Sequence, residues 1–202
     1  MKYRWHELTA KEQAELLAWR KSRGQPWHSP QHRSGTTNSY HLTAACYQHA
    51  PYIGQSLHRM RAFCEQLLPT ITATSATVRG WCVLPNHYHL LIETPNLLLT
   101  LSTVGKLHGR TSFDWNAQDH TRGRKVWYRC VDRSMRNKRH HWATLNYIHN
   151  NPVHHGYVRR WQDWPFGSAV EFLEQTGIKE ARELWQQYPV LDYGKGWDDP
   201  EL

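Results

Sequence analysis

His87 and His89 flank Tyr88 within LPNHYHLLIETP, an apolar stretch of residues 84–95. The pattern predicts a β-strand, in which side chains two residues apart point to the same face, so both imidazoles face one way and Tyr88 the other. Two neighbouring neutral imidazoles can hold a divalent metal ion. They can equally be polar side chains on a solvated sheet face, and the strand alone does not decide between these interpretations.

A second set of candidates lies in HHWATLNYIHNNP, residues 140–152. Its spacing predicts a helix on which Leu145 and Ile148 face the core. Tyr147 and Asn151 lie one turn apart on another side of that helix, so they can point into the same space. A tyrosine and an amide oxygen next to the two-histidine strand would complete a site.

The chain is basic, and its cations are concentrated in one segment. Its formal net charge of +8 at pH 7 and its pI of about 9.5 favour a polyanionic partner. Residues 121–141 hold eight Lys or Arg against one Asp, with Trp127 and Tyr128 among them. Cations interleaved with aromatic rings suit phosphates and stacked bases, so nucleic acid is the leading partner, although a solvated charged face would have the same composition. The candidate DNA contacts are Arg122, Arg124, Lys125, Arg133, Arg136, Lys138, Arg139 and His140.

These residue types suit the breaking of a phosphodiester bond. Tyr147 would be the nucleophile, forming a covalent phosphotyrosine that conserves bond energy for later rejoining. A phenol has a pKa of about 10 and is a weak nucleophile at neutral pH, so it needs a nearby cation or base. A metal ion bound by His87, His89 and the amide oxygen of Asn151 would polarise the phosphate. Mg²⁺ or Mn²⁺ fits this chemistry, although histidine pairs also bind zinc or nickel readily.

Periodicity predicts the elements that must position these residues. Strands are expected at 39–48, 76–85, 87–94 and 125–131, and helices at 56–68, 97–114, 137–150, 169–175 and 179–187. Pro152 is expected to end the third helix, since proline cannot continue the hydrogen-bond ladder. The order of elements predicts an α+β, ferredoxin-like fold, with a mainly antiparallel sheet, helices on one face, and the two histidines on the free face.

The chain divides into three parts by composition. Residues 1–37 are expected to form an N-terminal helical appendage and a basic linker, with Thr9 as N-cap and Glu12 completing a capping box. Residues 38–170 hold the predicted catalytic domain. Residues 171–202 are expected to form an acidic helical C-terminal tail, with eight acidic residues against three basic ones.

Composition also disfavours several protein classes. A chain of 202 residues suits one ordinary domain with a terminal appendage. There is no run of about 18 apolar residues, so no membrane crossing is expected, and the N-terminus lacks the apolar region of a secretory signal. The widely spaced cysteines indicate buried free thiols and a cytoplasmic, nucleoid-associated location rather than a zinc or redox motif. They are Cys46, Cys64, Cys82 and Cys130.

Several of these stretches resemble the motifs of a known family. PNHYHLLIE is similar to the His-hydrophobe-His motif of the single-tyrosine HUH transposases, and LNYIHNNPVHHGYV is similar to their tyrosine helix. VWYRCVDRSMRN and WQDWPFGSA extend the resemblance over about residues 38–170. The branch that the sequence resembles most is the REP-associated tyrosine transposases, domesticated bacterial relatives of insertion-sequence transposases.

The resemblance implies roles for individual residues. It assigns the nucleophile to Tyr147 and the metal ligands to His87, His89 and Asn151, while Tyr88 in the middle of the motif is a mild departure that keeps an apolar body. It implies a single-stranded DNA substrate, folded as a hairpin of a repetitive extragenic palindrome, which is nicked and transferred as in DNA transposition. A monomer or a dimer is expected, because in this superfamily the tyrosine helix can serve a partner subunit.

Two other functions stay open. A hairpin-binding protein on the same fold, with vestigial chemistry, would need the basic segment but has no reason to keep all four site residues. An RNA-binding domain of RRM-like topology is disfavoured, because no aromatic-rich strand signature of that class occurs.

Single residues also have simpler interpretations. Asn151 could cap the helix before Pro152, with Asn150 as the competing cap. A packing cluster, rather than a base-stacking surface, is expected for Trp161, Trp164 and Phe166.

Overall fold

The computed structural model describes residues 9–12, 14–15, 18 and 38–191 of the chain. Its strands are β1 (Ser39–Ala45), β2 (Thr77–Val83), β3 (His87–Glu93) and β4 (Val131–Ser134). Its helices are α2 (Leu57–Thr72), α3 (Leu97–Gln118), α4 (Lys138–His154), α5 (Ala169–Thr176) and α6 (Ile178–Gln187). Short 3-10 turns lie at Tyr47–His49, Ile53–Gln55 and Trp161–Asp163.

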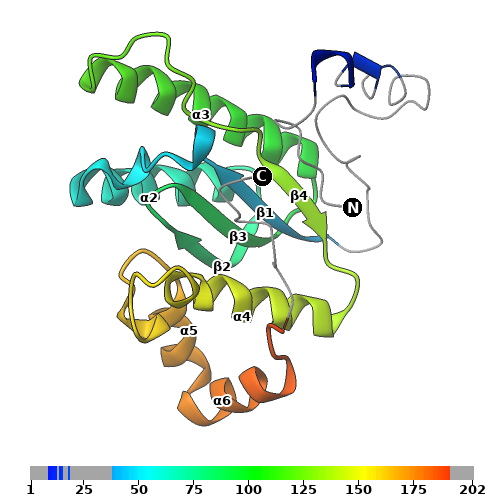
Figure 1. Ribbon diagram of the computed structural model, residues 1–202. Coiled ribbons are helices and arrows are strands. Elements are labelled where there is room, and N and C mark those ends of the chain that lie inside the picture. Colours follow the sequence, from blue (N-terminus) through cyan, green and yellow to red (C-terminus); the bar gives the residue numbers. More distant parts are fainter. Residues whose placement is uncertain (1–8, 13, 16–17, 19–37, 192–202) are drawn as a thin grey trace.

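The four strands form one antiparallel sheet in the order β2-β3-β1-β4 (Figure 1). Together with α2 and α3 they follow the strand-helix-strand-strand-helix-strand order of a ferredoxin-like fold. The predicted α+β class and antiparallel sheet are therefore confirmed. β3 is an inner strand, paired with β2 on one side and β1 on the other, and the two histidines lie in its first half.

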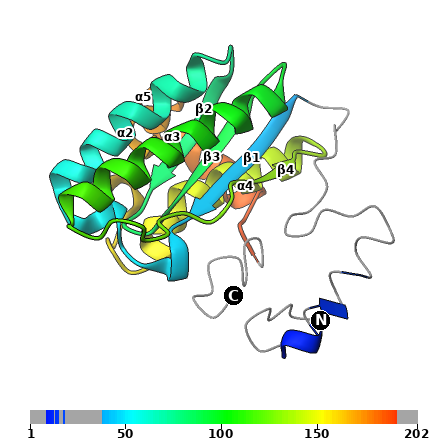
Figure 2. The same cartoon turned by 90° about the horizontal axis from the view of Figure 1, so that it is seen from above.

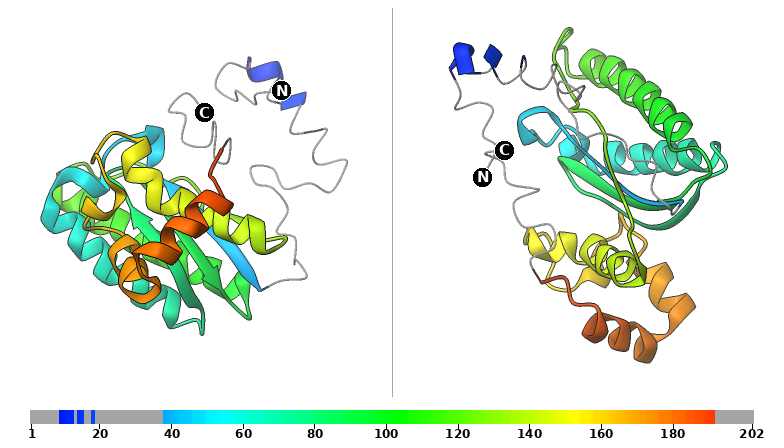
Figure 3. Two further views of the ribbon diagram at one scale, coloured as in Figure 1. Left: turned by 90° about the horizontal axis from the view of Figure 1, so that it is seen from below. Right: turned by 90° about the vertical axis from the view of Figure 1, so that its right-hand side faces the viewer.

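The helices occupy both faces of the sheet. Helices α2 and α3 lie side by side on one face, as Figure 2 shows, whereas α4 lies on the other, with α5 and α6 beyond it (Figure 3). The expectation of helices on one face thus holds for α2 and α3, but the face expected to be free is covered by α4. The pattern of β3 explains this, because six of its seven residues are buried and both of its faces must be covered.

Glycine allows α4 to approach the sheet closely. A β-carbon at Gly80 of β2 would collide with the Cδ1 atom of Leu145 on α4. Leu145 and Ile148 are buried in the cluster between this helix and the sheet, so the predicted core side of the helix is confirmed. The cluster also contains Leu91 of β3, whose side chain lies on the same face as the histidines.

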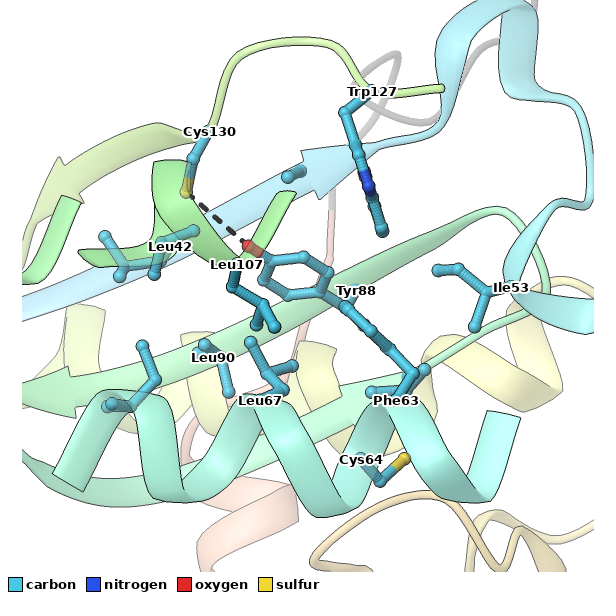
Figure 4. Close-up of a cluster of buried hydrophobic side chains, with 14 of the residues drawn as sticks. Leu42, Ile53, Phe63, Cys64, Leu67, Tyr88, Leu90, Leu107, Trp127 and Cys130 are labelled. Carbon is cyan, nitrogen blue, oxygen red and sulfur yellow. Dashed lines mark hydrogen bonds between the residues drawn. The ribbon is translucent and has the colours of Figure 1, made fainter. Parts of the chain in front are cut away.

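The main core lies between the sheet and the α2/α3 layer. Tyr88 points into it, where its hydroxyl lies 3.0 Å from Nε2 of His108 and donates to the Cys130 sulfur (Figure 4). Trp127 is 7% exposed, stacks on His108, and donates from Nε1 to Thr111 Oγ1 at 3.0 Å. The interpretation of Trp127 as a base-stacking residue is therefore wrong.

The remaining packing expectations can also be compared with the structure. All four cysteines are buried free thiols, as predicted, and burial raises the pKa of Cys46, Cys64 and Cys130 to about 12. The aromatic residues of the segment before α5 pack as predicted. Trp161 stacks on His149, and Trp164 contacts Phe166 and donates to the Val83 carbonyl.

The predicted bounds of the fourth strand and of the helix that contains Pro152 are wrong. The fourth strand begins at Val131, and the expected strand at 125–131 is an extended segment with one isolated bridge, between Trp127 and Cys46. Pro152 lies inside α4, which continues to His154. Proline's fixed φ is compatible with a helix, and this one removes a single hydrogen bond close to the end, so the last turn still forms.

The N-terminal expectations are tested only in part. The Thr9 N–H donates to Glu12 Oε2 at 2.7 Å and the Glu12 N–H to Thr9 Oγ1 at 3.3 Å, so the capping box is confirmed. Most of the predicted appendage and linker lies outside the described residues, and the three-part division stays a prediction. In the described part of the chain, none of the helices has the length and apolarity needed to cross a bilayer.

A nearly buried ion cluster joins α2, α3 and the basic segment. Asp119, just after α3, accepts from Nη1 of Arg59 at 3.0 Å and from Nη2 of Arg124 at 2.7 Å. These hydrogen bonds, with Arg59 the larger contributor, lower the Asp119 pKa to about 2. Arg124 also donates to Asn116 and lies over the Tyr52 ring, so this predicted DNA contact is held by the fold.

We expect Asp119→Asn to destabilise the protein by about 3 kcal/mol, because two guanidinium groups lose their counter-charge. The Asp119 pKa is depressed in the fold from its ordinary value of 3.8 to about 2. Its contribution is therefore fully present above about pH 4 and is lost as the pH falls towards 2. Urea unfolding of both proteins over this range should show their stability difference shrinking.

Asp163→Asn is the matched control for this prediction. Asp163 pairs with Arg160 on the surface, where the side chains are 37% and 69% exposed, so its loss should cost less than about 1 kcal/mol. An equal loss of stability in both variants would contradict a structural role for the Asp119 cluster.

Candidate active site

The two histidines of β3 face α4. His87 pairs with Ala45 and His89 with Thr43 across the β1–β3 ladder, and the strand alternation places both imidazoles on the same face. Their ring centroids are 5.0 Å apart. Both side chains are buried, at 2% and 0% exposure. The predicted pairing of the imidazoles is present, but in a covered layer rather than on a solvated face.

Helix α4 brings Asn151 to the first of these histidines. The Oδ1 atom of Asn151 lies 3.0 Å from Nε2 of His87. Asn151 is 0% exposed and lies within α4, whose C-cap is His155, so the interpretation of Asn151 as the helix cap is wrong. Its Nδ2 atom is buried and has no hydrogen-bond partner among the described residues. An unsatisfied buried donor is costly, so this amide has a hydrogen-bonding capacity that the described residues do not use.

Tyr147 lies one turn before Asn151 and contacts the second histidine. Its ring meets that of His89 edge to face, with centroids 5.2 Å apart, and meets that of His41 at 6.1 Å. Tyr147 is 4% exposed. The structure therefore brings together all four residues that the sequence singled out, two from the central strand and two from a helix much later in the chain.

Two further residues orient the histidines. Nδ1 of His87 lies 2.8 Å from Oδ1 of Asn86, and Nδ1 of His89 lies 3.1 Å from Nε2 of His41. Histidines that bind metals typically have one ring nitrogen held in this way by a neighbour, which fixes the tautomer of the other. The sequence reasoning missed both residues. The signal for His41 was available, because it lies two residues before Thr43 on β1 and is thus a diagonal neighbour of His89.

The donor types at this site are compatible with a divalent metal ion. The 3.0 Å between His87 Nε2 and Asn151 Oδ1 is an ordinary hydrogen-bond distance, and these two atoms would both have to turn towards an ion that they held. Within the described residues, no cluster of three or more His, Cys, Asp or Glu side chains is arranged to hold a metal. The candidate set here has two imidazoles and an amide oxygen as its third donor.

His155 and His149 have different surroundings, since the first lies beside the candidate site and the second does not. The His155 ring lies 5.0 Å from that of His87, at the edge of the candidate site. His149 lies on the side of α4 that faces β2, where its Nε2 is 3.0 Å from Ser168 Oγ. Burial lowers the His149 pKa to about 3, so this ring stays neutral and contributes to packing rather than to the site.

The predicted DNA-contacting residues separate into two groups. Arg133, Arg136, Lys138 and Arg139 are exposed on β4 and the start of α4, the helix that carries Tyr147. His140 is half-buried and accepts from the Arg136 N–H at 3.2 Å. Before β4, Lys125 is exposed, Arg124 is held by Asp119, and Arg122 lies over the Phe113 ring at 4.3 Å.

Known proteins resemble this chain in sequence and in fold. No protein-family model matches the chain. A protein of Haemophilus influenzae assigned as a REP-associated tyrosine transposase is 32% identical over 126 residues, which cover 54% of this chain and 66% of that protein. The REP-associated tyrosine transposase of Escherichia coli is 28% identical over 99 residues, covering 45% and 53%. The chain is a relative of the REP-associated tyrosine transposases.

The matches have a limited extent. They cover slightly under two thirds and about half of the lengths of the two curated relatives. The solved structure of a REP-associated tyrosine transposase bound to a REP hairpin has the same fold, with a TM-score of 0.57 at 17% identity over 73% of this chain and 86% of that one. The family resemblance seen in the sequence motifs is thus confirmed.

Proposed function

We propose that the protein is a metal-dependent, single-stranded DNA endonuclease and strand transferase that acts on hairpins of repetitive extragenic palindromes. The observation that carries this proposal is that α4 brings Asn151 to His87 and Tyr147 to His89, with His87 Nε2 and Asn151 Oδ1 3.0 Å apart and the rings of His89 and Tyr147 in contact. A DNA substrate and four buried free thiols favour a cytoplasmic location near the nucleoid.

In the proposed reaction, the Tyr147 hydroxyl attacks a DNA phosphorus atom. A bond forms between the phenolic oxygen and phosphorus, the bond from phosphorus to a sugar oxygen breaks, and that oxygen leaves with a proton. The covalent phosphotyrosine keeps the bond energy, so a second strand end can displace the tyrosine and be joined. His89, whose ring packs against Tyr147, keeps the phenol close to the phosphate-binding side of the site.

The residues present fit a divalent ion such as Mg²⁺ or Mn²⁺. His87, His89 and Asn151 would hold it, and when bound it would polarise the scissile phosphate and offset the charge that develops there. His41 and Asn86 hold the two imidazoles in one orientation through their Nδ1 atoms. The Nδ2 donor of Asn151, which lacks a partner in the described part of the chain, can bond to a phosphate oxygen.

One observation favours the alternative of a hairpin-binding protein with vestigial chemistry. His87, His89, Tyr147 and Asn151 are at most 4% exposed. A DNA strand can reach them only after the atoms that cover them move aside, which costs part of the binding energy. A strand transferase forms a covalent protein–DNA adduct, whereas a hairpin-binding protein forms none.

Tyr147→Phe should abolish this adduct while hairpin binding stays within about twofold, because only the hydroxyl is lost. The measurement is incubation with a single-stranded hairpin oligonucleotide and Mg²⁺, followed by denaturing electrophoresis. Tyr157→Phe, at a tyrosine that is 44% exposed, is the control and should form the adduct at the normal rate. An adduct in the Tyr147 variant would show that another tyrosine is the nucleophile, and no adduct in the unmodified protein would favour the binding-only alternative.

His41→Ala should weaken Mn²⁺ binding about 10- to 100-fold, because the ring of His89 loses the neighbour that orients it. Calorimetric titration of the full chain with Mn²⁺ measures this without DNA. His41→Gln, which retains a polar atom for His89, should recover part of the affinity. His58→Ala, at an exposed histidine of α2, should change nothing, and an equal effect in that variant would contradict the assignment.

Replacing Arg133, Arg136, Lys138 and Arg139 by glutamine should weaken DNA binding for all sequences and reduce its salt dependence. Each phosphate contact on a single strand contributes about 0.7 to the slope of log affinity against log salt, so four contacts would lower it by about 3. The control neutralises Arg61, Lys106 and Arg110, exposed on the α2/α3 layer, and should leave the slope unchanged. A constant slope in the first variant would place the DNA elsewhere.

A further inference from the structure

Two segments far apart in the sequence meet beside the His87 end of the sheet. The Tyr47 N–H donates to the Val126 carbonyl at 2.7 Å, and the Tyr128 N–H donates to the Ala45 carbonyl at 2.9 Å. Ala45 is also the β1 partner of His87. The end of β1 and the segment before β4 are therefore joined next to the candidate active site.

These segments present two tyrosine rings and a lysine. The rings of Tyr47 and Tyr128 are half-buried, with centroids 5.1 Å apart, and Lys125 Nζ lies 4.5 Å from the first and 5.3 Å from the second. Trp127 points into the core on the α2/α3 side, and in an extended segment its neighbour Tyr128 points to the opposite side. We call Tyr47, Tyr128 and Lys125 the tyrosine platform.

Lys125 differs from its neighbour Arg124 in what it binds. Arg124 is held by Asp119 and Asn116. Lys125 is exposed, lies over the two aromatic rings, and has no carboxylate partner within the described residues. Its ammonium group therefore keeps its donors for an external acceptor. An unpaired cation over aromatic rings is the combination that binds a nucleotide through its phosphate and its base.

The backbone that carries Tyr47 is strained. Gln48 and His49 both have positive φ, 54° and 51°, although neither is a glycine. Consecutive side-chain-bearing residues in this region of φ are uncommon, and such strain concentrates at functional sites. Here the two residues with positive φ turn the chain directly after Tyr47, so the chain does not continue along the sheet. The Tyr47 ring is left against the ring of Tyr128.

Asn86 connects the strained turn to the candidate metal ligand. Its Nδ2 donates to the His49 carbonyl at 3.1 Å, and its Oδ1 lies 2.8 Å from His87 Nδ1. One side chain thus spans the gap between the turn beside the platform and the imidazole of the site. The His49 ring lies 6.3 Å from that of Tyr128, so the platform, the strained turn and His87 are neighbours at this end of the sheet.

We propose that the tyrosine platform is a subsite for an unpaired nucleotide of the DNA strand, adjacent to the one at the active site. The base stacks on one of the two rings, which are tilted by 51° to each other and support one another, while Lys125 turns away from the rings to bind the phosphate. This inference rests on the proposed single-stranded DNA substrate. The inferred subsite requires that the nucleotide at this position carry a base. Any of the four bases meets the requirement, because every base has a face that can stack.

The test compares two hairpin oligonucleotides with a single-stranded extension, one intact and one with abasic sites throughout the extension. Binding is followed by fluorescence anisotropy in the full chain with Tyr147→Phe, so that no adduct forms. Removal of the bases should weaken binding about tenfold or more. With Tyr47→Ala or Tyr128→Ala, the intact oligonucleotide should bind about tenfold more weakly, and the abasic one should bind no worse than the intact one.

Conservative and control variants make this test specific. Tyr128→Phe keeps the ring and should retain the effect of the abasic sites. Phe113→Ala removes another ring that lies under a cation, that of Arg122, at an aromatic residue 66% exposed on α3, and should show the same loss of affinity on removal of the bases as the parent does. Thermal melting of each variant checks that the fold is intact.

The outcomes separate this inference from the proposed function. An abasic penalty that persists unchanged in the alanine variants, or is absent from the parent, would overturn the subsite even if the protein with Tyr147 intact forms the adduct. A penalty that disappears in the alanine variants supports the subsite, even if no adduct forms and the cleavage proposal fails.

Discussion

The contact between α4 and the histidine face of the sheet is the interaction on which the rest of the structure depends. It brings Asn151 to His87 and Tyr147 to His89, and it is made close by Gly80, where a β-carbon would collide with Leu145. The apolar cluster around this contact holds α4 on the sheet, because burial of apolar surface is the main favourable contribution to such packing. The polar residues at its edge add little stability, but the cluster holds them at fixed positions.

The alternation of side chains along β3 places core residues on one face of the strand and the candidate site residues on the other. One side of β3 sends Tyr88, Leu90 and Ile92 into the main core, and the other sends the two histidines and Leu91 towards α4. Both sides are buried, so each polar group on them needs a partner. For His87 and His89 the partners include Asn86, His41 and Asn151, and this requirement connects the histidines to β1, to the turn before β3 and to the tyrosine helix.

The basic segment after α3 has both structural and surface roles. Arg124 joins Asp119 and Arg59 in a nearly buried cluster that anchors the segment to α2 and α3, and Trp127 anchors it to the core. With these two residues fixed, Lys125 and Tyr128 are left on the surface beside the site. Composition alone grouped Arg124, Lys125, Trp127 and Tyr128 as nucleic-acid contacts. It counts charges and rings but carries no information on the partners of each side chain.

The sequence by itself determined the local features of this protein. The period of two put His87 and His89 on one face, the period of the helix put Tyr147 and Asn151 on one side, and the capping box at Thr9 formed as its spacing requires. Only the tertiary structure decided that α4 covers the histidine face, that His41 joins His89, and that Trp127 and Arg124 belong to the fold. The physical reason is range: periodicity and capping depend on residues within a turn or a strand, whereas the partner of a buried face is chosen by packing among segments distant in the sequence.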